Sequence, residues 1–173
     1  FLNNVAVRSG GAIENIGNTA YDPGSVGPAI AEVTNSTFTG NSAGKQGGAI
    51  DNKRDSTLTV DQTTFTSNSA RFGGGISNKS HAIFGPGTAN VTNSDFDNNM
   101  ASDYGGGFYN SLNDATITGT DFTGNSSVEG GGIAGLDGGE VTLTGGVVSG
   151  NSATTNGGGL FNSASVFNVD GAT

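Results

Sequence analysis

One short phrase recurs through the whole chain and constrains the fold more than any other feature. The stretch FTGNSAGKQGGAIDN at 38–52 returns as FTSNSARFGGGISN at 65–78, with asparagines and paired glycines kept and the residues between them varied. Its glycine part occurs six times, as GGAIEN (10–15), GGAIDN (47–52), GGGISN (73–78), GGGFYN (105–110), GGGIAG (130–135) and GGGLFN (157–162). Such periodicity indicates a repeat architecture, in which each unit packs only against its neighbours.

Two other segments keep the same order from repeat to repeat. A Phe-x-x-Asn motif begins at Phe1, Phe38, Phe65, Phe96 and Phe122, and Val148 replaces the phenylalanine in the last copy. The short alternating runs are AEVT (31–34), LTVD (58–61), ANVT (89–92), ATIT (115–118), VTLT (141–144) and FNVD (167–170). Successive glycine phrases start 37, 26, 32, 25 and 27 residues apart, so the basic unit has about 26 residues.

This order of segments predicts an all-β fold: a right-handed parallel β-helix (solenoid) of about six rungs, with three short strands per rung. No unit can bury its apolar side alone, whereas stacked copies bury all of them. We expect a single domain over residues 1–173, forming a segment of a longer repeat protein. The extra length of the first and third units predicts loop excursions at 16–29 and 79–88.

Alternation of side chains along each strand assigns the apolar residues to inner columns. We expect one column of Val33, Val60, Val91, Ile117, Leu143 and Val169, one of Ile13, Ile50, Ile76, Phe108, Ile133 and Leu160, one of the Phe-x-x-Asn phenylalanines, and a small one of Ala6, Ala43, Ala70, Ala101, Ser127 and Ala153. The same rule predicts an outward-facing flat strip, able to receive a lateral partner, at Ala12, Ala49, Gly75, Gly107, Gly132 and Gly159.

The repeated asparagines predict two structural ladders along the axis of the coil. Asparagine tolerates the left-handed backbone of a sharp corner, and its amide both donates and accepts hydrogen bonds. Stacked copies can therefore bond to one another from rung to rung. One ladder contains Asn4, Asn41, Asn68, Asn99, Asn125 and Asn151; the other contains Asn15, Asn52, Asn78, Asn110 and Asn162 and is interrupted by Gly135.

The charge of the chain limits its partners. The formal net charge is −9, and the six basic residues all lie between Arg8 and Lys79. A surface of this sign repels phosphate backbones and anionic lipid headgroups, which excludes nucleic-acid and membrane-surface binding as general functions. The chain has no cysteine, which fits a secreted bacterial protein that needs no disulfides.

The pairing of GGAI with a following FxxN resembles the polymorphic outer-membrane protein repeat, a family known from chlamydial autotransporter passenger domains and from large surface proteins of environmental bacteria. Six ordered copies of the glycine phrase extend the resemblance over essentially the whole chain. The resemblance implies a parallel β-helix in an extracellular, cell-surface or outer-membrane-associated protein. It implies adhesion or surface display as a role and carries little information on any chemical activity.

One candidate patch for a ligand or partner comes from the two long units. Their loops flank the rung that contains DNKRD (51–55), and long loops on a rigid scaffold are common places for binding residues. The patch consists of Tyr21, Asp22, Lys53, Arg54, Asp55, Lys79, His81 and Phe84. The bland interpretation of the same residues is a set of solvated turn charges that pair with their neighbours.

The sequence therefore predicts a non-enzymatic structural or adhesive module, with a protein or glycan as partner and self-association end to end or laterally. We expect no catalytic residue and no cofactor or metal site, apart from weak calcium binding by surface aspartates. Other β-helices are polysaccharide lyases or hydrolases, so a glycan-active enzyme or a glycan-binding protein is the alternative. An ice-binding protein is a third hypothesis, because Thr116, Thr118, Thr142 and Thr144 form a small outward array.

Overall fold

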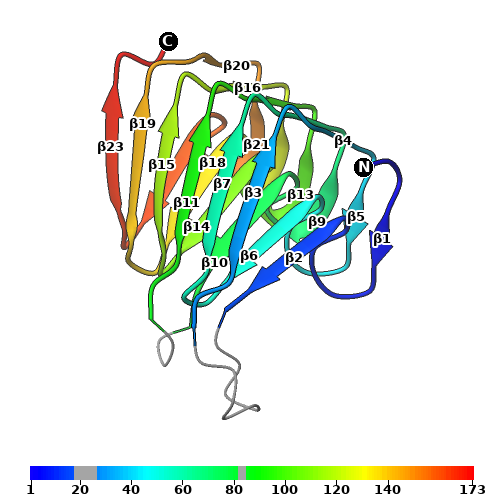
Figure 1. The fold of residues 1–173 in the computed structure, drawn as a ribbon. Helices are drawn as coiled ribbons and strands as arrows, with labels where there is room; N and C mark the ends of the chain where they lie inside the picture. Colours follow the sequence, from blue (N-terminus) through cyan, green and yellow to red (C-terminus); the bar gives the residue numbers. More distant parts are fainter. Residues whose placement is uncertain (18–26, 82–84) are drawn as a thin grey trace.

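A computed structural model describes residues 1–17, 27–81 and 85–173, and these residues contain β-strands and no helix. The strands form four parallel sheets, each built from equivalent segments of successive repeats. Figure 1 shows the strands of each sheet side by side along the stack, with the N- and C-termini at opposite ends. The chain is thus a parallel β-solenoid, as the repeats predicted.

We number the sheets by their first strand. Sheet 1 contains β1 (Val5–Ala6), β5 (Ser42–Ala43), β9 (Ser69–Phe72), β13 (Met100–Tyr104), β17 (Ser126–Glu129) and β21 (Ser152–Asn156). Sheet 2 contains β2 (Ile13–Ile16), β6 (Ile50–Lys53), β10 (Ile76–Lys79), β14 (Phe108–Ser111), β18 (Ile133–Leu136) and β22 (Leu160–Ser163).

Sheet 3 contains β3 (Ile30–Thr34), β7 (Thr57–Asp61), β11 (Thr88–Thr92), β15 (Asp114–Thr118), β19 (Glu140–Thr144) and β23 (Val166–Asp170). Sheet 4 contains β4 (Thr37–Thr39), β8 (Thr64–Thr66), β12 (Asp95–Asp97), β16 (Asp121–Thr123) and β20 (Val148–Ser149). The solenoid therefore has four strands per turn where three were predicted. The additional one is the Ser-Ala segment after each Phe-x-x-Asn motif, which pairs with its own copies instead of forming only a narrow corner.

The predicted inner columns are present and form the core. Val60 pairs with Val33 and Val91, and Ile76 pairs with Ile50 and Phe108, all in parallel register. The phenylalanines stack face to face, with ring centroids 5.0 Å apart for Phe38 and Phe65 and interplanar angles of 9°. This separation matches the spacing of about 4.8 Å between neighbouring strands, so backbone pairing and ring stacking reinforce each other.

The asparagine ladders are also present. In the first ladder, Asn68 Nδ2 donates to Asn99 Oδ1 at 3.0 Å, and the same oxygen accepts the backbone N–H of Asn68 at 2.9 Å. The second ladder runs through Asn52 and Asn78, whose amides are 2.8 Å apart, and is interrupted at Gly135. In the first ladder the left-handed corner residue is the one before each asparagine, such as Gly40 (φ 65°) before Asn41, and in the second a left-handed residue lies two positions after an asparagine, as Arg54 (φ 64°) does after Asn52.

The predicted flat outer strip is wrong, because these residues face the core. Gly75, Gly107 and Ala49 are buried, and a Cβ on Gly75 would lie 2.8 Å from Cδ1 of the Phe96 ring. The cause is a bulge: the N–H groups of Gly75 and Ile76 both donate to the Gly107 carbonyl oxygen at 3.0 Å. Two successive residues then share the inward side, which resets the alternation.

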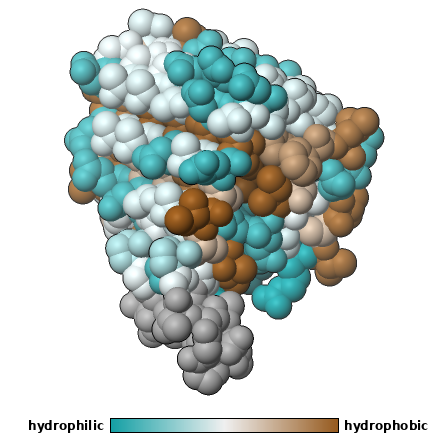
Figure 2. Space-filling view, viewed as in Figure 1, coloured by the Kyte–Doolittle hydropathy of each residue, from teal (hydrophilic) through white to brown (hydrophobic). Residues whose placement is uncertain are grey.

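The outer surface is largely polar, and apolar atoms gather at the end of the stack formed by β1 (Figure 2). Val5 and Val7 are exposed there, and Val169 is exposed on the last rung. Stacking of copies end to end stays a prediction. No helix long and apolar enough to span a membrane occurs among the residues that the structure describes.

Candidate functional site

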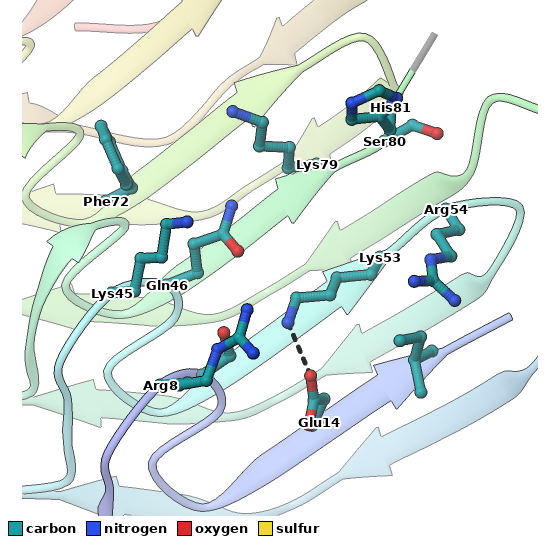
Figure 3. A pocket seen from close by; sticks show the side chains of 12 residues that line it. Arg8, Glu14, Lys45, Gln46, Lys53, Arg54, Phe72, Lys79, Ser80 and His81 are labelled. Atoms are coloured by element: carbon teal, nitrogen blue, oxygen red, sulfur yellow. Dashed lines mark hydrogen bonds and ion pairs between the residues drawn. The ribbon is translucent and has the colours of Figure 1, made fainter. Parts of the chain in front are cut away.

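Five of the six basic residues of the chain line one groove of about 520 Å³ on the side of the solenoid. Figure 3 shows cations from separate repeats directed into the same space. The residues that line this basic groove are Arg8, Ser9, Glu14, Ile16, Lys45, Gln46, Lys53, Arg54, Phe72, Lys79, Ser80 and His81. Among the residues that the structure describes, Glu14 is the single carboxylate in this lining, so the described part of the groove has the opposite sign to the chain as a whole.

The floor of the groove is the outer face of sheet 2. In β6 the side chains of Ile50 and Asn52 point inward, to the core and the second ladder, so Lys53 lies on the outer side. Parallel register places Lys53 between Ile16 and Lys79 on the neighbouring strands. The second ladder therefore determines which residues form the floor.

The wall of the groove is the segment that leads out of sheet 1. Parallel bridges join Ser9 to Gln46 and Gln46 to Phe72, so these three residues occupy one position on successive rungs. The preceding residues of the first two rungs, Arg8 and Lys45, consequently lie one rung apart. The backbone agrees, because the N–H of Lys45 donates to the Arg8 carbonyl oxygen at 2.7 Å.

Lys53 is held at the floor by two carboxylates. Its Nζ lies 2.6 Å from Glu14 Oε1 and 2.8 Å from Asp51 Oδ2. Asp51 is fully buried. Burial raises the pKa of the Asp51 carboxyl above its ordinary value of 3.8, and the positive charge of Lys53 opposes this rise.

Phe72 supplies an aromatic surface beside the cations. Lys79 Nζ lies 5.7 Å from the centroid of the Phe72 ring and 5.8 Å from that of Tyr109. The two rings are 5.4 Å apart, and Tyr104 continues the cluster at 6.3 Å from Tyr109. Such cation–π contacts orient the lysine without neutralising its charge.

Three cations of the groove, Arg8, Lys45 and Lys79, form no ion pair with a carboxylate of residues 1–17, 27–81 or 85–173. Lys53 differs from them, because it pairs with Glu14 and Asp51. Arg8 and Lys45 are exposed and Lys79 is half-buried. Their uncompensated charges give the groove an attraction for anions that the two acids at Lys53 do not cancel.

The structure brings together part of the patch predicted from the sequence. Lys53, Arg54, Lys79 and His81 line the groove, whereas Asp55 is half-buried outside its lining. The other predicted members, Tyr21, Asp22 and Phe84, lie outside the described residues. Binding of a ligand or partner by this patch stays a prediction.

Sequence reasoning missed Arg8, Lys45 and Phe72. A signal for the first two was present, because Arg8 and Lys45 each stand two residues before the first glycine of a glycine phrase. Arg71 has the same offset in the third repeat. A basic residue recurring at one offset in a solenoid predicts a column of cations, since equivalent positions stack.

No group of three or more His, Asp or Glu side chains that could hold a metal ion occurs in the part of the chain that the structure describes. The weak calcium binding expected from surface aspartates stays a prediction.

Two segments of the chain, residues 35–53 and 62–79, match the Chlamydia polymorphic membrane protein repeat. Each match includes a Phe-x-x-Asn motif and the glycine phrase that follows it. No curated protein and no solved structure matches the chain significantly. The matched repeat belongs to a family of membrane proteins and not to a known family of enzymes.

Proposed function

Because the chain carries polymorphic membrane protein repeats in a parallel β-solenoid, we propose that it is an adhesive, non-enzymatic module of a cell-surface or outer-membrane protein. The observation that carries this proposal is the way the repeated residues are used. The repeated phenylalanines stack in the core and the repeated asparagines form the ladders, so both stabilise the scaffold. The residues that vary from rung to rung face outward, where they can contact a partner.

The test uses the source organism. Antibodies against this chain should label intact cells, and protease added to intact cells should remove the label. Deleting the segment in the genome, while keeping its reading frame, should lower adherence of the cells to surfaces or to other cells. Labelling that requires permeabilised cells would contradict surface display, and unchanged adherence would contradict the adhesive role.

A glycan-active enzyme is the second candidate. The observation in its favour is the buried Asp51, whose pKa is raised. Its carboxyl group pairs with Lys53, which lines the groove. Perturbed carboxyl groups near a groove are candidates for acid–base chemistry. Incubating the chain with acidic polysaccharides and measuring unsaturated products and new reducing ends separates the two proposals, because adhesion produces neither.

Ice binding is the third candidate, and the structure of sheet 3 gives it less support than the other two candidates have. Its outward column contains Thr59, Asn90, Thr116 and Thr142 in register. Glu32 is the parallel partner of Thr59, and Asn168 is the parallel partner of Thr142. The column of threonines is therefore bounded at both ends by polar residues of other shapes. A measurement of thermal hysteresis tests this hypothesis directly.

A further inference from the structure

We propose that the basic groove binds a short stretch of an acidic polysaccharide, through carboxylate or sulfate groups on successive sugars. This inference deepens the adhesive role and rests on it. It depends on three features of the groove: the sign of its charge, the spacing of its cations along the axis, and the aromatic ring beside them.

The charge selects an anion. In a chain of net charge −9, five cations converge on one groove, and the described part of its lining holds one carboxylate, Glu14. Arg8 and Lys45 reach the solvent-exposed rim, where charges steer a ligand to the site. Glu14 and Asp51 hold Lys53 in the floor and balance its positive charge. Lys53 therefore contributes a positioned N–H donor and little net charge.

The spacing favours a glycan over a peptide. The wall cations Arg8 and Lys45, and likewise the floor lysines Lys53 and Lys79, lie on adjacent rungs, which repeat about every 4.8 Å. This repeat is close to the length of one pyranose unit. Successive residues of an extended acidic peptide lie about 3.3 Å apart, which does not match the rungs. A polysaccharide running parallel to the solenoid axis can therefore place one sugar at each rung, with anionic groups reaching the wall and the floor in turn.

The aromatic ring fits the same ligand. Phe72 is half-buried in the lining, and Lys79 Nζ lies 5.7 Å from the centroid of its ring. Apolar faces of pyranose rings pack on aromatic side chains, while neighbouring cations hold the acidic groups. The cationic wall ends at the next rung, where Asp103 follows Arg71 and their side chains pair at 2.7 Å. The groove thus suits two or three charged sugars, and a long nucleic-acid strand would meet carboxylates beyond it.

The proposal is tested by titrating the purified chain with a galacturonate hexasaccharide and following heat or chemical-shift changes. The methyl-esterified hexasaccharide is the matched neutral ligand, a heparin-derived hexasaccharide separates sulfate from carboxylate recognition, and a single-stranded thymidine hexanucleotide represents nucleic acid. We expect binding of one or both acidic glycans. Binding should weaken strongly as salt rises from about 0.01 M to about 1 M, because screening shortens from about 30 Å to about 3 Å.

The double variant Arg8→Ala/Lys45→Ala should lower the affinity by about tenfold. Arg71→Ala is the matched control, because it removes a basic residue of the same wall that is already paired with Asp103 outside the lining. It should leave the affinity nearly unchanged. Lys79→Gln provides an independent test at the floor and should also weaken binding. Thermal melting of each variant, compared with the parent, establishes that the fold is retained.

The proposal is overturned if neither acidic glycan binds, if the neutral ligand binds equally well, if the hexanucleotide binds more tightly than both glycans, or if the double variant and Arg71→Ala have equal effects. Failure here is distinguishable from failure of the adhesive role. If the purified chain fails to bind acidic glycans, but intact cells display it and its deletion lowers their adherence, the adhesive role is retained. The acidic glycan is then excluded as its ligand.

Discussion

The first three rungs and the last three rungs use the same backbone and present opposite chemistry. In the first three, the position two residues before each glycine phrase holds Arg8, Lys45 and Arg71. The same position then holds Asp103, Val128 and Thr155, which line a second hollow of about 310 Å³ together with Tyr104 and Glu129. Parallel register determines where a side chain lies, and the residue type at that position alone determines the charge of the surface.

The two regions meet at the Arg71–Asp103 ion pair. Tyr104 follows Phe72 in register, so the aromatic column continues across the boundary while the charge changes sign. A solenoid can therefore place surfaces of different specificity next to each other without altering its core. If scaffold and surface are separate in this way, a substitution in a ladder should destabilise both regions, whereas a substitution at the surface should change one region alone.

Asn99→Leu should have the largest effect, because it breaks a ladder on which both regions depend. The variant removes the acceptor of the Asn68 N–H and of one Nδ2 hydrogen, so the buried N–H loses its partner while Nδ2 keeps its bond to the Phe38 carbonyl oxygen. Each lost partner costs about 1–3 kcal/mol of unfolding free energy. Urea denaturation should show a large decrease. Asn162→Leu is the control: its Nδ2 bonds within its own rung to Ser165 O and is exposed, so a comparable loss there would contradict the ladder explanation.

Val128→Lys/Thr155→Lys should extend the cationic wall into the acidic region. Both residues line the second hollow, and Thr155 is exposed. We expect severalfold tighter binding of the galacturonate hexasaccharide at low salt, because two more rungs then carry cations. Titration at low and high salt measures the gain. An unchanged affinity would show that the groove of the first rungs depends on more than the positions of its charges.

The variant Asp51→Asn tests how a buried acid of the basic region changes the pH dependence of stability, in comparison with an exposed acid elsewhere. The pKa of Asp51 is raised, so the folded chain holds this proton to higher pH than the unfolded chain. Its contribution to stability is therefore largest in acid and falls as pH rises above the ordinary value of 3.8. Asp51→Asn should melt a few degrees higher than the parent at pH 7 and should lose this advantage toward pH 4. The exposed Asp170→Asn serves as control, and equal pH profiles for both variants would argue against the burial effect.

Arg71→Ala should have the smallest effect on stability. The ion pair with Asp103 is open to solvent, with side-chain exposures of 54% and 30%, and such pairs contribute about 0–1 kcal/mol. The urea midpoint should shift little. A loss as large as that of Asn99→Leu would mean that the charge boundary supports the scaffold and that the two regions are not independent.

Much of the fold could be predicted from the sequence, because stacked repeats place like residues on like. Phe38 over Phe65 and Asn41 beside Asn68 follow directly from the repeat. The flat strip was predicted wrongly, since alternation cannot reveal a bulge such as the one at Gly75. The fourth strand of each turn was missed because its copies carry no regular alternation of apolar residues, as in Ser69–Phe72 and Ser152–Asn156.

The groove was harder to predict than the core. Its rim residues Arg8 and Lys45 and its floor residue Lys79 come from three repeats and two sheets. Their proximity depends on how the segment after sheet 1 turns toward the outer face of sheet 2, which a repeat pattern does not specify. The fixed offset before the glycine phrase is the one sequence feature that points to the wall.

The amide-to-amide bonds of the two ladders all point the same way, with Nδ2 donating to the C-terminal neighbour, as Asn41 does to Asn68 and Asn15 does to Asn52. The solenoid is therefore polar along its axis. A whole repeat can be duplicated or deleted and the amides re-form across the junction, whereas an inverted repeat would set donors against donors. Proteins of this kind can change length by unequal recombination between repeats without redesigning their interior.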